Sequence, residues 1–526
     1  MEGLYNGLFL HVVLYNGHCH KIVEEGGRMI YFPDAGQMKA ADRYTIDVLG
    51  IPSLELMERA AESCVQIMEA EGIDLSKICV ICGSGNNGGD GFAIARMLKE
   101  KKLDVELVFI GKEVSCTEET RRQMQLFQKV GGRISNTYEE KEYSVIVDAI
   151  FGVGLSRPIE GKYFEIIESL NRSKAVRVAV DIPSGISADT GCVMGTAVRA
   201  DLTVTFQKRK LGLIFYPGCE YAGRVFIADI GICTEKMEED AETVFSYEPS
   251  LFSELLPERK PDSHKGTYGK VLIIAGSKGM AGAAYLNALS AYRTGAGLVQ
   301  IYTVEENRMI LQQLLPEAII TAYDSYDEEE VRGLLTWADV VCIGSGIGVN
   351  ECSEKILEMV VKNVQVPCVV DADGLNILAG HPQYLEGISA GQFVFTPHLK
   401  EMSRLTRIDV ETLKSRRIDA ARAFAEKYPV VCVMKDARTV VACAGRQTYV
   451  NISGNAAMAK AGSGDVLAGI ITGLLAQGKD CFEGACIGVL LHGMAGDAAK
   501  VEKGSYSVLA RELADGIAAV LSRKED

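Results

Sequence analysis

Apolar runs alternate with amphipathic stretches along most of this chain, and the alternation is the main guide to its fold. Residues 36–68 carry apolar side chains at helical spacing. Strand-like apolar runs then alternate with helical segments, and this first series of runs covers residues 77–85, 104–111, 144–152, 176–185 and 201–206. Continuous apolar strands are typical of a parallel sheet that is covered on both faces. The pattern therefore predicts a doubly wound, Rossmann-like α/β domain.

A second series of apolar runs follows a more acidic stretch. Residues 233–250 are acidic and less apolar, and we interpret them as a linker or a peripheral excursion. The later runs cover residues 269–277, 297–304, 338–346, 366–374, 393–398 and 429–436, and two apolar helices follow them. We therefore expect a second α/β domain, with no short-period repeat in either half.

The length of the chain supports this division. Its 526 residues exceed what one hydrophobic core usually supports. We expect an N-terminal extension over residues 1–28, a first domain over residues 29–240 and a second domain over residues 241–526. Whether the extension is native stays open, because Met29 would also give a natural beginning. The apolar run at residues 8–15 is interrupted by a histidine and lacks the basic leader of a signal peptide.

The net charge indicates which kinds of partner the chain can bind, and the cysteine content indicates its redox compartment. The formal net charge of −15 disfavours a nucleic-acid backbone or an anionic membrane as partner, so a small molecule is the better default. No apolar segment reaches the roughly 20 residues that span a bilayer. The odd count of 15 cysteines fits a reducing cytoplasm. Cys79 and Cys82 form a CxxC inside an apolar run, which favours buried strand residues over a metal pair.

The stretch at residues 454–469, GNAAMAKAGSGDVLAG, carries the clearest chemistry. Backbone N–H groups of Gly462, Ser463 and Gly464 can converge on an anion at the start of a helix near Asp465. A carboxylate beside such a cradle can take the proton of a hydroxyl group while the cradle stabilises a transferring phosphoryl group. The spacing therefore indicates phosphoryl transfer to an alcohol, although a tightly packed turn under a helix is the alternative.

Polar residues follow three strands of the first domain. The glycines of a GxGxxG directly follow the first strand, but the next strand lacks the acidic residue of a nicotinamide redox domain. Asp148 follows a second strand, and Asp181 and Ser184 follow a third. Ligands of open α/β sheets bind at the carboxyl ends of the strands, so these side chains predict one crevice. Any one of them could instead be a helix cap.

Three motifs of the first domain resemble the NAD(P)HX epimerase family, the YjeF N-terminal family, whose substrates are the hydrated forms of NADH and NADPH. The motifs are GNNGGDG at residues 85–91, VDAIFGVGLSRPIEG at residues 147–161 and VDIPSG at residues 180–185, and the resemblance covers residues 29 to about 235. It implies that the substrate is bound by Asn86, Asn87, Gly88, Gly89, Asp90, Gly152, Val153, Gly154, Leu155, Ser156, Arg157, Pro158 and Asp181.

The same resemblance implies a potassium site and a catalytic group. Asn87, Asp148 and Ser184 match the potassium ligands, and oxygen ligands from three loops suit a hard cation. Asp181 matches the residue at the hydrated nicotinamide ring, and we assign it as the acid/base that inverts the hydroxyl-bearing carbon. Lys208 either stabilises a transient negative charge or is a solvated surface lysine.

The second domain resembles the ADP/ATP-dependent NAD(P)HX dehydratases, which have a ribokinase-like fold, from about residue 250 onward. The resemblance rests on the segments 264–284, 338–348, 371–376, 396–405, 434–441 and 454–469 taken in order. It implies that Ala283, Gly346, His398 and Asp465 contact the substrate. It further implies that the nucleotide is bound by Lys435, Asp436, Ala437, Arg438, Thr439 and Gly464, with Asp465 as the base. His398 could instead be a hydrogen-bonded histidine in a turn at a strand end.

The reaction that this resemblance implies is phosphorylation of the ring hydroxyl of the S hydrate, followed by loss of phosphate. Mg²⁺ is expected, because nucleotide phosphoryl transfer needs its charge neutralised. Several positions depart from the commonest family pattern, namely Lys400, Asp436, Ala457 and Ala461, each in place of a glycine. The choice between ADP and ATP therefore stays open, with ADP the usual bacterial preference.

The leading hypothesis is a bifunctional repair enzyme, in which the first domain interconverts the epimers of NADHX and NADPHX and the second dehydrates the S form. One alternative is a ribokinase-like kinase for a vitamin or sugar alcohol, fused to a nucleotide-binding domain. Another is a first domain that serves only as a binding or scaffold module, although retention of its polar strand ends argues against it. We expect a cytoplasmic homo-oligomer without a membrane or nucleic-acid partner.

Overall fold

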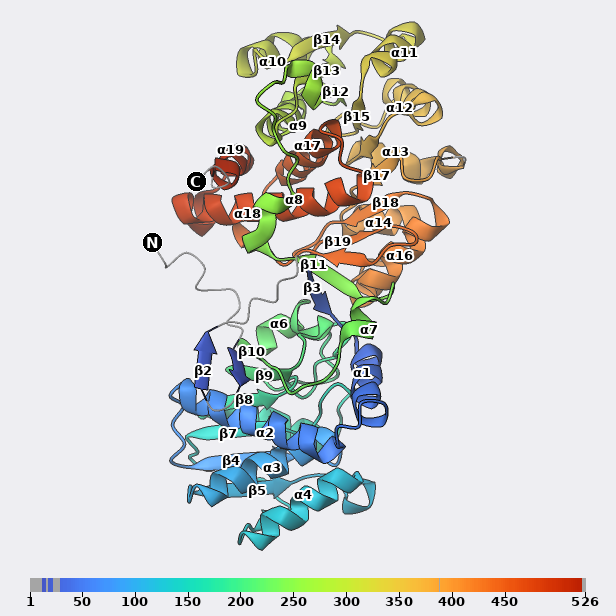
Figure 1. Cartoon of the computed structure of the whole chain (residues 1–526). Helices are drawn as coiled ribbons and strands as arrows, with labels where there is room; N and C mark the ends of the chain where they lie inside the picture. The colour runs from blue at the N-terminus through green and yellow to red at the C-terminus, as the bar shows by residue number, and fades with distance from the viewer. Residues whose placement is uncertain (1–11, 16–17, 22–28, 387, 523–526) are drawn as a thin grey trace. The chain divides into compact units, whose positions relative to one another are not determined.

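The computed structural model describes residues 12–15, 18–21, 29–386 and 388–522 (Figure 1). Its contacts define two compact units. The first unit holds Tyr31–Thr243, and the second holds Val244–Asp526 together with Met29 and Ile30. Within the expected N-terminal extension, β1 (Val12–Tyr15) and β2 (His18–Lys21) form an antiparallel pair, and the rest of residues 1–28 lies outside the described residues.

The first unit contains a seven-stranded sheet in the order β10-β9-β8-β7-β4-β5-β6, and every neighbouring pair is parallel. The central strands β4, β7 and β9 are buried along their whole length, which explains their continuous apolar sequences. The strands are β4 (Ile78–Cys82), β5 (Val105–Phe109), β6 (Ile134–Ser135), β7 (Val145–Ala149), β8 (Val176–Val180), β9 (Leu202–Phe206) and β10 (Arg224–Ala228).

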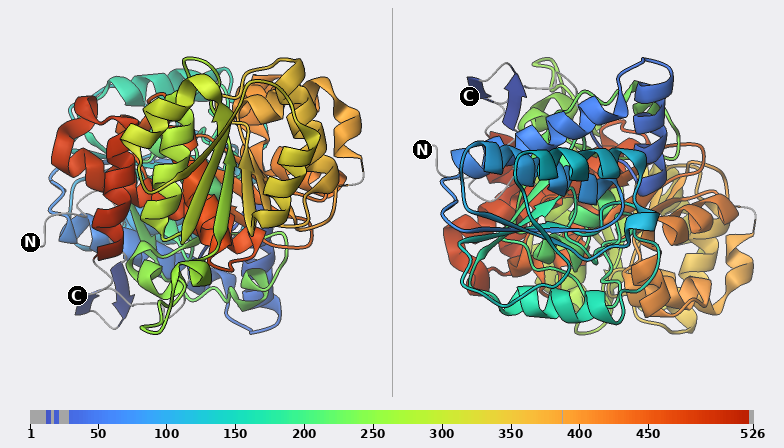
Figure 2. Two further views of the ribbon diagram at one scale, coloured as in Figure 1. Left: turned by 90° about the horizontal axis from the view of Figure 1, so that it is seen from above. Right: turned by 90° about the horizontal axis from the view of Figure 1, so that it is seen from below.

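Helices cover both faces of this sheet. One hydrophobic core joins α1 to α4 to one face, and a second core joins α5 to the other, as the right-hand view of Figure 2 shows. The helices are α1 (Ala35–Asp47), α2 (Ser53–Ala70), α3 (Asn86–Glu100), α4 (Glu118–Lys129), α5 (Lys162–Arg172), α6 (Gly218–Tyr221) and α7 (Glu235–Glu238). The doubly wound fold expected from the sequence is therefore confirmed.

The sheet of the second unit has the strand order β14-β13-β12-β15-β16-β17-β18-β19-β20-β11-β3, and its edge strand β3 belongs to this unit through Met29 and Ile30 only. From β14 to β18 in this spatial order, every neighbouring pair of strands is parallel. The pairs β18–β19 and β19–β20 are antiparallel. Their bounds are β3 (Met29–Phe32), β11 (Val244–Tyr247), β12 (Lys270–Ile274), β13 (Leu298–Val304), β14 (Ile319–Tyr323), β15 (Val340–Ile343), β16 (Cys368–Val370), β17 (Phe393–Phe395), β18 (Val431–Met434), β19 (Val440–Ala442) and β20 (Thr448–Val450).

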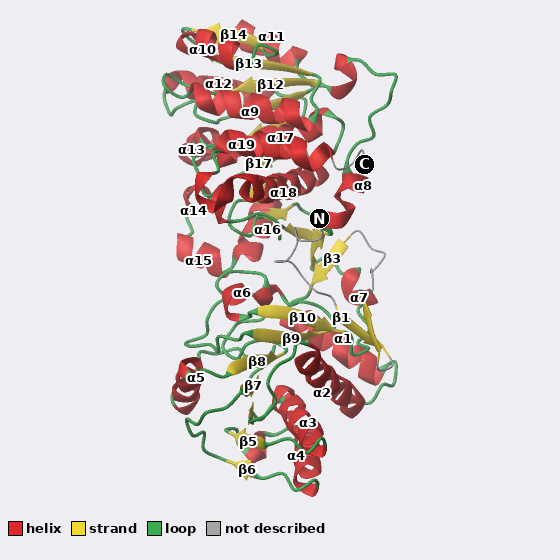
Figure 3. Cartoon of the chain, turned by 90° about the vertical axis from the view of Figure 1, so that its left-hand side faces the viewer, coloured by secondary structure: helices red, strands yellow, loops and turns green. Residues whose placement is uncertain are grey.

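The helices of the second unit lie on both sides of the parallel strands, as the left-hand view of Figure 2 shows for α9 and α12. Helices α9 and α17 pack on each other and on the central strands. The bounds are α8 (Phe252–Leu255), α9 (Ala281–Thr294), α10 (Arg308–Leu314), α11 (Glu328–Trp337), α12 (Glu351–Asn363), α13 (Asp373–Gly380), α14 (Leu399–Thr406), α15 (Val410–Ser415), α16 (Arg417–Lys427), α17 (Ser463–Ala476), α18 (Cys481–Ser507) and α19 (Ala510–Leu521). Figure 3 shows the layered α/β architecture of each unit.

Two sequence interpretations can be compared directly with these elements. The interpretation of residues 233–250 as a linker was wrong for Val244–Tyr247, because these residues form the fully buried strand β11. The interpretation of Cys79 and Cys82 is confirmed, because both thiols are buried in β4. Among the described residues, no helix is long and apolar enough to cross a membrane.

Candidate active sites

The turn from β4 to α3 brings the start of a helix against the strand ends of the first unit. A Cβ on Gly83 would lie 2.0 Å from the carbonyl oxygen of Ile150, and a Cβ on Gly88 would lie 2.0 Å from the carbonyl oxygen of Gly83. A Cβ on Gly85 would meet nothing within 4 Å. Two glycines of the GxGxxG therefore serve close backbone packing, and the third borders open space.

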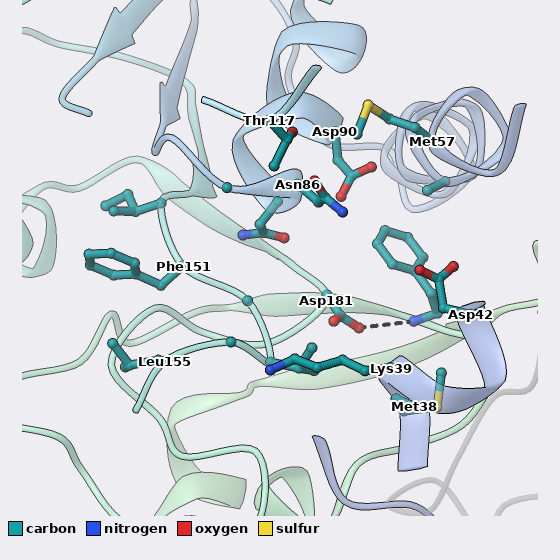
Figure 4. A pocket seen from close by; sticks show the side chains of 18 of the residues that line it. Met38, Lys39, Asp42, Met57, Asn86, Asp90, Thr117, Phe151, Leu155 and Asp181 are labelled. Carbon is teal, nitrogen blue, oxygen red and sulfur yellow. Dashed lines mark hydrogen bonds between the residues drawn. The ribbon is translucent and has the colours of Figure 1, made fainter. Parts of the chain in front are cut away.

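That space is a cavity of about 750 Å³ beside the carboxyl ends of the strands. Figure 4 shows Asn86, Asp90, Phe151, Leu155 and Asp181 around it. From the expected substrate set, the lining residues are Asn86, Asn87, Asp90, Gly152, Val153, Gly154, Leu155, Arg157 and Asp181, whereas Gly88, Gly89, Ser156 and Pro158 do not line it. The sequence did not indicate the wall that α1 contributes through Met38, Lys39 and Asp42.

Asp181 follows β8 and forms a buried ion pair with Lys210. Lys210 is 1% exposed, and its ammonium donates to the Asp181 carboxylate, to Thr205 Oγ1 at 3.0 Å and to the Phe206 carbonyl oxygen at 2.8 Å. Asp181 Oδ1 also accepts from Thr205 Oγ1 at 3.1 Å. Lys210 lines the cavity together with Asp181, so it can balance negative charge at the ring of a bound substrate.

The cation considered from the sequence, Lys208, has a different position. Its ammonium lies 3.1 Å from the Glu238 carboxylate, and its side chain does not line the cavity. Lys208 and Lys210 both belong to the segment TFQKRKLG, and the spacing alone could not tell which side chain turns inward. Lys210 was therefore missed, although the segment that contains it was noted.

Asp90 brings a second carboxyl group to the same cavity from α3. Burial, reinforced by the negative charges of Asp181 and Asp42, raises the pKa of Asp90 well above its usual range. Of the three aspartates that line the cavity, Asp181 is paired with a lysine and Asp90 is protonated more readily, so these two provide both a base and an acid. This arrangement suits proton transfer to and from a small substrate.

The three expected potassium ligands lie around the loop that follows β7. Ser184 Oγ donates to Asp148 Oδ1 at 2.6 Å, and the Ser184 N–H donates to Asp148 Oδ2 at 2.8 Å. Burial raises the pKa of Asp148 to about 6 although these hydrogen bonds oppose the shift. A Cβ on Gly152 would lie 3.3 Å from Asn87 Oδ1, so Asn87 contacts the same loop. The buried amide oxygen and nitrogen of Asn87 have no hydrogen-bond partner within the described structure.

In the second unit, Asp465 occupies the third position of α17. Gly462 precedes the helix with φ at 91°, in the left-handed region that glycine adopts readily. Burial and the nearby Asp371 carboxylate raise the pKa of Asp465 to about 6, while Lys435 and Ser345 oppose the shift. A carboxylate with this pKa at a helix start can accept a proton from a hydroxyl group.

Lys435 lies beside this helix start and is held by Asp371. Its Nζ lies 2.6 Å from Asp371 Oδ1, and a Cβ on Gly464 would lie 3.4 Å from the same Nζ. Asp371 directly follows β16 and was not among the predicted site residues. The segment DADGLN at residues 371–376 carried a signal for it, because an aspartate there ends a buried strand.

His398 caps α14 next to Lys435. Its Nδ1 accepts from the N–H groups of Lys400 and Glu401, and its own N–H donates to Glu401 Oε2 at 2.8 Å. Burial lowers the pKa of His398 and raises the pKa of Glu401 to about 7. With Nδ1 as an acceptor, the neutral ring carries its proton on Nε2, which lies 3.3 Å from Glu401 Oε1.

The remaining predicted residues of this site fall into two groups. A Cβ on Gly346 would lie 3.0 Å from Ala283 Cβ, so these two substrate candidates adjoin each other. In the expected nucleotide-binding run, Asp436 pairs with Arg417 at 3.2 Å, and Thr439 Oγ1 donates to the Asp436 carbonyl oxygen at 3.1 Å. The Asp436 carboxylate is therefore balanced by a buried arginine.

These features define the class of protein as an α/β enzyme with two candidate sites. One is a carboxylate-lined cavity in a Rossmann-like unit, and the other is a carboxylate at a glycine-rich helix start in a second α/β unit. The family model described as YjeF-related protein N-terminus matches residues 53–212, and the model described as NAD(P)H-hydrate dehydratase matches residues 271–519.

Curated relatives match across almost the whole chain. The bifunctional NAD(P)H-hydrate repair enzyme Nnr of Thermofilum pendens is 36% identical over 89% of this chain and 92% of its own length. The Nnr proteins of Moorella thermoacetica and Escherichia coli K12 are each 35% identical, over 94% and 91% of this chain and over 98% and 92% of their own lengths. The chain therefore belongs to the family of bifunctional NAD(P)H-hydrate repair enzymes.

A solved structure is similar to about half of the chain. The ADP/ATP-dependent NAD(P)H-hydrate dehydratase of Bacillus subtilis, co-crystallised with ATP and Mg²⁺, is 30% identical. The match covers 53% of this chain and 98% of that one, with a TM-score of 0.46.

Proposed function

We propose that the first unit interconverts the R and S epimers of NADHX and NADPHX, and that the second unit dehydrates the S epimer to NADH or NADPH at the expense of a nucleotide. The observation that carries this proposal is the pair of separate sites, each with a carboxylate at the strand ends of its own sheet. Membership in the repair-enzyme family supports the same assignment. One unit supplies the substrate of the other, so both epimers are repaired.

In the first unit, Asp181 acts as the acid/base at the hydroxyl-bearing carbon of the hydrated ring. Lys210 neutralises its charge inside the cavity, and Asp90 offers a second carboxyl group to the same space. Asn86 at the start of α3 and the loop at residues 152–158 orient the dinucleotide.

A potassium ion fits the residues of the first unit. The unpartnered amide of Asn87 and the oxygens of Asp148 and Ser184 form a set of hard donors around one loop. We propose that these three residues hold K⁺, which would supply a positive charge that fixes this loop beside the substrate.

In the second unit, Asp465 accepts the proton of the ring hydroxyl as the hydroxyl oxygen attacks the terminal phosphoryl group. The bond from that phosphorus to the bridging oxygen breaks, and the nucleotide leaves one phosphate shorter. The N–H groups at the start of α17 and the ammonium of Lys435 stabilise the charge of the transferred group. Phosphate then leaves with the electron pair of the carbon–oxygen bond, and loss of a proton from the adjacent carbon restores the ring double bond. Phosphorylation thus turns hydroxide into a viable leaving group.

We expect Mg²⁺ to enter this site with the phosphates of the nucleotide. Within the described part of the chain, no group of three or more His, Cys, Asp or Glu side chains is arranged to hold a metal ion. Mg²⁺ commonly keeps several waters and binds through substrate phosphates, which agrees with such a site. ADP is the proposed phosphoryl donor, with ATP as the alternative.

We further propose that residues 29–240 and 241–526 are the two functional domains, and that the chain is cytoplasmic. Thirteen cysteines between Cys64 and Cys486, leaving Cys219 aside, have free thiols, and this supports a reducing compartment. We also propose a homo-oligomer, since Met309, Ile310 and Leu314 on α10 expose apolar side chains. Sedimentation velocity of the whole chain tests this assembly.

The decisive assay follows the near-ultraviolet absorbance of reduced nicotinamide after an NADHX epimer mixture is added with Mg²⁺, K⁺ and either ADP or ATP. Complete, nucleotide-dependent recovery supports both activities. Asp181→Asn should stop recovery after the S epimer, and Asp465→Asn should abolish recovery while epimer exchange continues. A stable phosphorylated alcohol, without recovery of absorbance, would instead identify a kinase.

A further inference from the structure

Asp371 lies at the meeting point of four strand ends in the second unit. The side chain is 2% exposed, and its hydrogen-bond partners are polar groups that follow neighbouring strands. Oδ1 accepts from Lys435 Nζ at 2.6 Å and from Thr396 Oγ1 at 2.6 Å, and Oδ2 accepts from Ser345 Oγ at 3.1 Å. The carboxylate is therefore held in one orientation from both sides.

Through this contact Asp371 determines where the Lys435 ammonium lies. Lys435 Nζ would be 3.4 Å from a Cβ on Gly464, so the ammonium adjoins the first turn of α17. The Lys435 side chain is 17% exposed, so it keeps access to a ligand. Burial alone would lower the pKa of Lys435, but the charges of Asp371 and Glu401 more than offset burial and raise it.

Asp371 also affects the pKa of Asp465, through its charge rather than through a hydrogen bond. Burial is the largest cause of the raised pKa of Asp465, and the charge of Asp371 is the next. The other groups that face Asp465 are Lys435 and Ser345, which lower its pKa, and Asp373, which raises it. Asn287 of α9 donates to the backbone carbonyl oxygen of Asp465 at 3.0 Å, and not to the Asp465 carboxylate.

We propose that Asp371 is a positioning residue of the dehydration reaction, which fixes the Lys435 ammonium beside the start of α17 and balances its charge next to Asp465. Asp371 itself touches neither the nucleotide nor the hydroxyl group. The inference rests on the proposed dehydratase activity of the second unit. It adds a residue to which the sequence motifs gave no role.

The principal variant is Asp371→Asn in the full chain, because asparagine keeps the shape and an accepting oxygen but removes the charge. The expected result is a loss of about thirtyfold or more in kcat/KM for the nucleotide, since a buried ammonium loses its counterion. Both limbs of the pH profile of kcat/KM should move to lower pH. The acidic limb moves because Asp465 loses a negative neighbour, and the basic limb because Lys435 does.

Asp373→Asn is the matched control. It removes the same charge two residues away, but Asp373 Oδ2 accepts from the Gly348 N–H at 2.9 Å and has no contact with Lys435. In this variant the acidic limb of the pH profile should move slightly to lower pH, and the basic limb should not move. The kcat/KM for the nucleotide should stay within about threefold of the wild-type value. Epimerisation in the same chain controls for protein amount, and fluorescence of the single tryptophan, Trp337 in α11, reports folding of the second unit.

A second variant, Thr396→Val, covers the case in which Asp371→Asn does not fold. It removes one hydrogen bond to Asp371 but keeps every charge, so kcat/KM for the nucleotide should fall severalfold with both limbs in place. If the Asp371→Asn chain folds, wild-type kinetics in this variant would overturn the inference. If it does not fold, wild-type kinetics in Thr396→Val would do so. Wild-type protein that fails to dehydrate S-NADHX would instead refute the proposed function.

Discussion

Replacing Lys210 by methionine breaks the ion pair in the first unit with little change in side-chain length. Lys210 is 1% exposed and donates three hydrogen bonds, of which one goes to Asp181. Removing one partner of a buried ion pair costs about 3–5 kcal/mol, because the other charge stays buried without compensation. Asp181 still accepts from Thr205 at 3.1 Å and its side chain is 12% exposed, so we expect a cost near 3 kcal/mol at the lower end of this range.

Two further variants, Asp181→Asn alone and Asp181→Asn combined with Lys210→Met, give the coupling free energy between the two side chains. Asp181→Asn leaves an ammonium at 1% exposure, so its cost should reach at least about 3 kcal/mol as well. The double variant buries a neutral pair and should be less destabilised than the sum of the two by about 3 kcal/mol. Both single variants should also lose epimerisation.

Hydrogen exchange gives the free energy of opening in peptides from β8 and β9, the strands that carry the pair. Trp337 fluorescence during urea unfolding should stay at its wild-type midpoint, because this tryptophan belongs to the second unit. Lys208→Met is the control. The Lys208 side chain is 9% exposed, but its partner Glu238 is 31% exposed and stays partly hydrated once the lysine is removed, so we expect a smaller cost than for Lys210→Met. If the cost in the double variant equals the sum of the two single costs within about 0.5 kcal/mol, the reasoning is refuted.

Three further predictions concern single groups at the two sites. The pKa of Asp90 is raised on folding, so its contribution to stability is complete below its unfolded pKa of about 4 and is lost as pH rises toward the folded value. Asp90→Asn should therefore melt above wild type at pH 7 and not below pH 4, and a pH-independent difference would contradict this. Asn87→Ala should raise the K⁺ concentration for half-maximal epimerisation by about tenfold, and an unchanged K⁺ titration would count against Asn87 as a ligand. The acidic limb of dehydration should lie near pH 6, the pKa of Asp465, and a limb near pH 4 would show that burial does not act on this group.

The sequence predicted the architecture because apolar periodicity is a local property that packing only reinforces. Buried parallel strands such as β4 and β9 have continuous apolar sequences, and the sheet of each unit follows from them. Strand β11 was missed because four residues, VFSY, within an acidic stretch do not form a pattern of their own. Their burial depends on β20, a strand about 200 residues later that no local pattern reveals.

At the sites, the sequence indicated which strand ends carry chemistry, but not how their side chains pair. Asp181 follows an apolar strand and Asp465 lies within a glycine-rich motif, and both patterns are visible in the sequence. The pairing of Lys210 with Asp181 and of Lys435 with Asp371 is visible only in the fold. The choice between Lys208 and Lys210 depends on which side chain points inward after β9, a matter of backbone conformation beyond the strand. Three-dimensional pairing of opposite charges is therefore what the sequence left undetermined.

The two units share one electrostatic arrangement although their folds differ. Each buries a lysine against an aspartate at a strand end, Lys210 with Asp181 and Lys435 with Asp371. In the first unit the paired aspartate is the proposed catalytic group, so the lysine serves the carboxylate. In the second unit the lysine faces the proposed phosphate site, so the aspartate serves the lysine, and Asp465 beside it is the proposed base. The same buried pair can thus support proton transfer or phosphoryl transfer, depending on which partner faces the substrate.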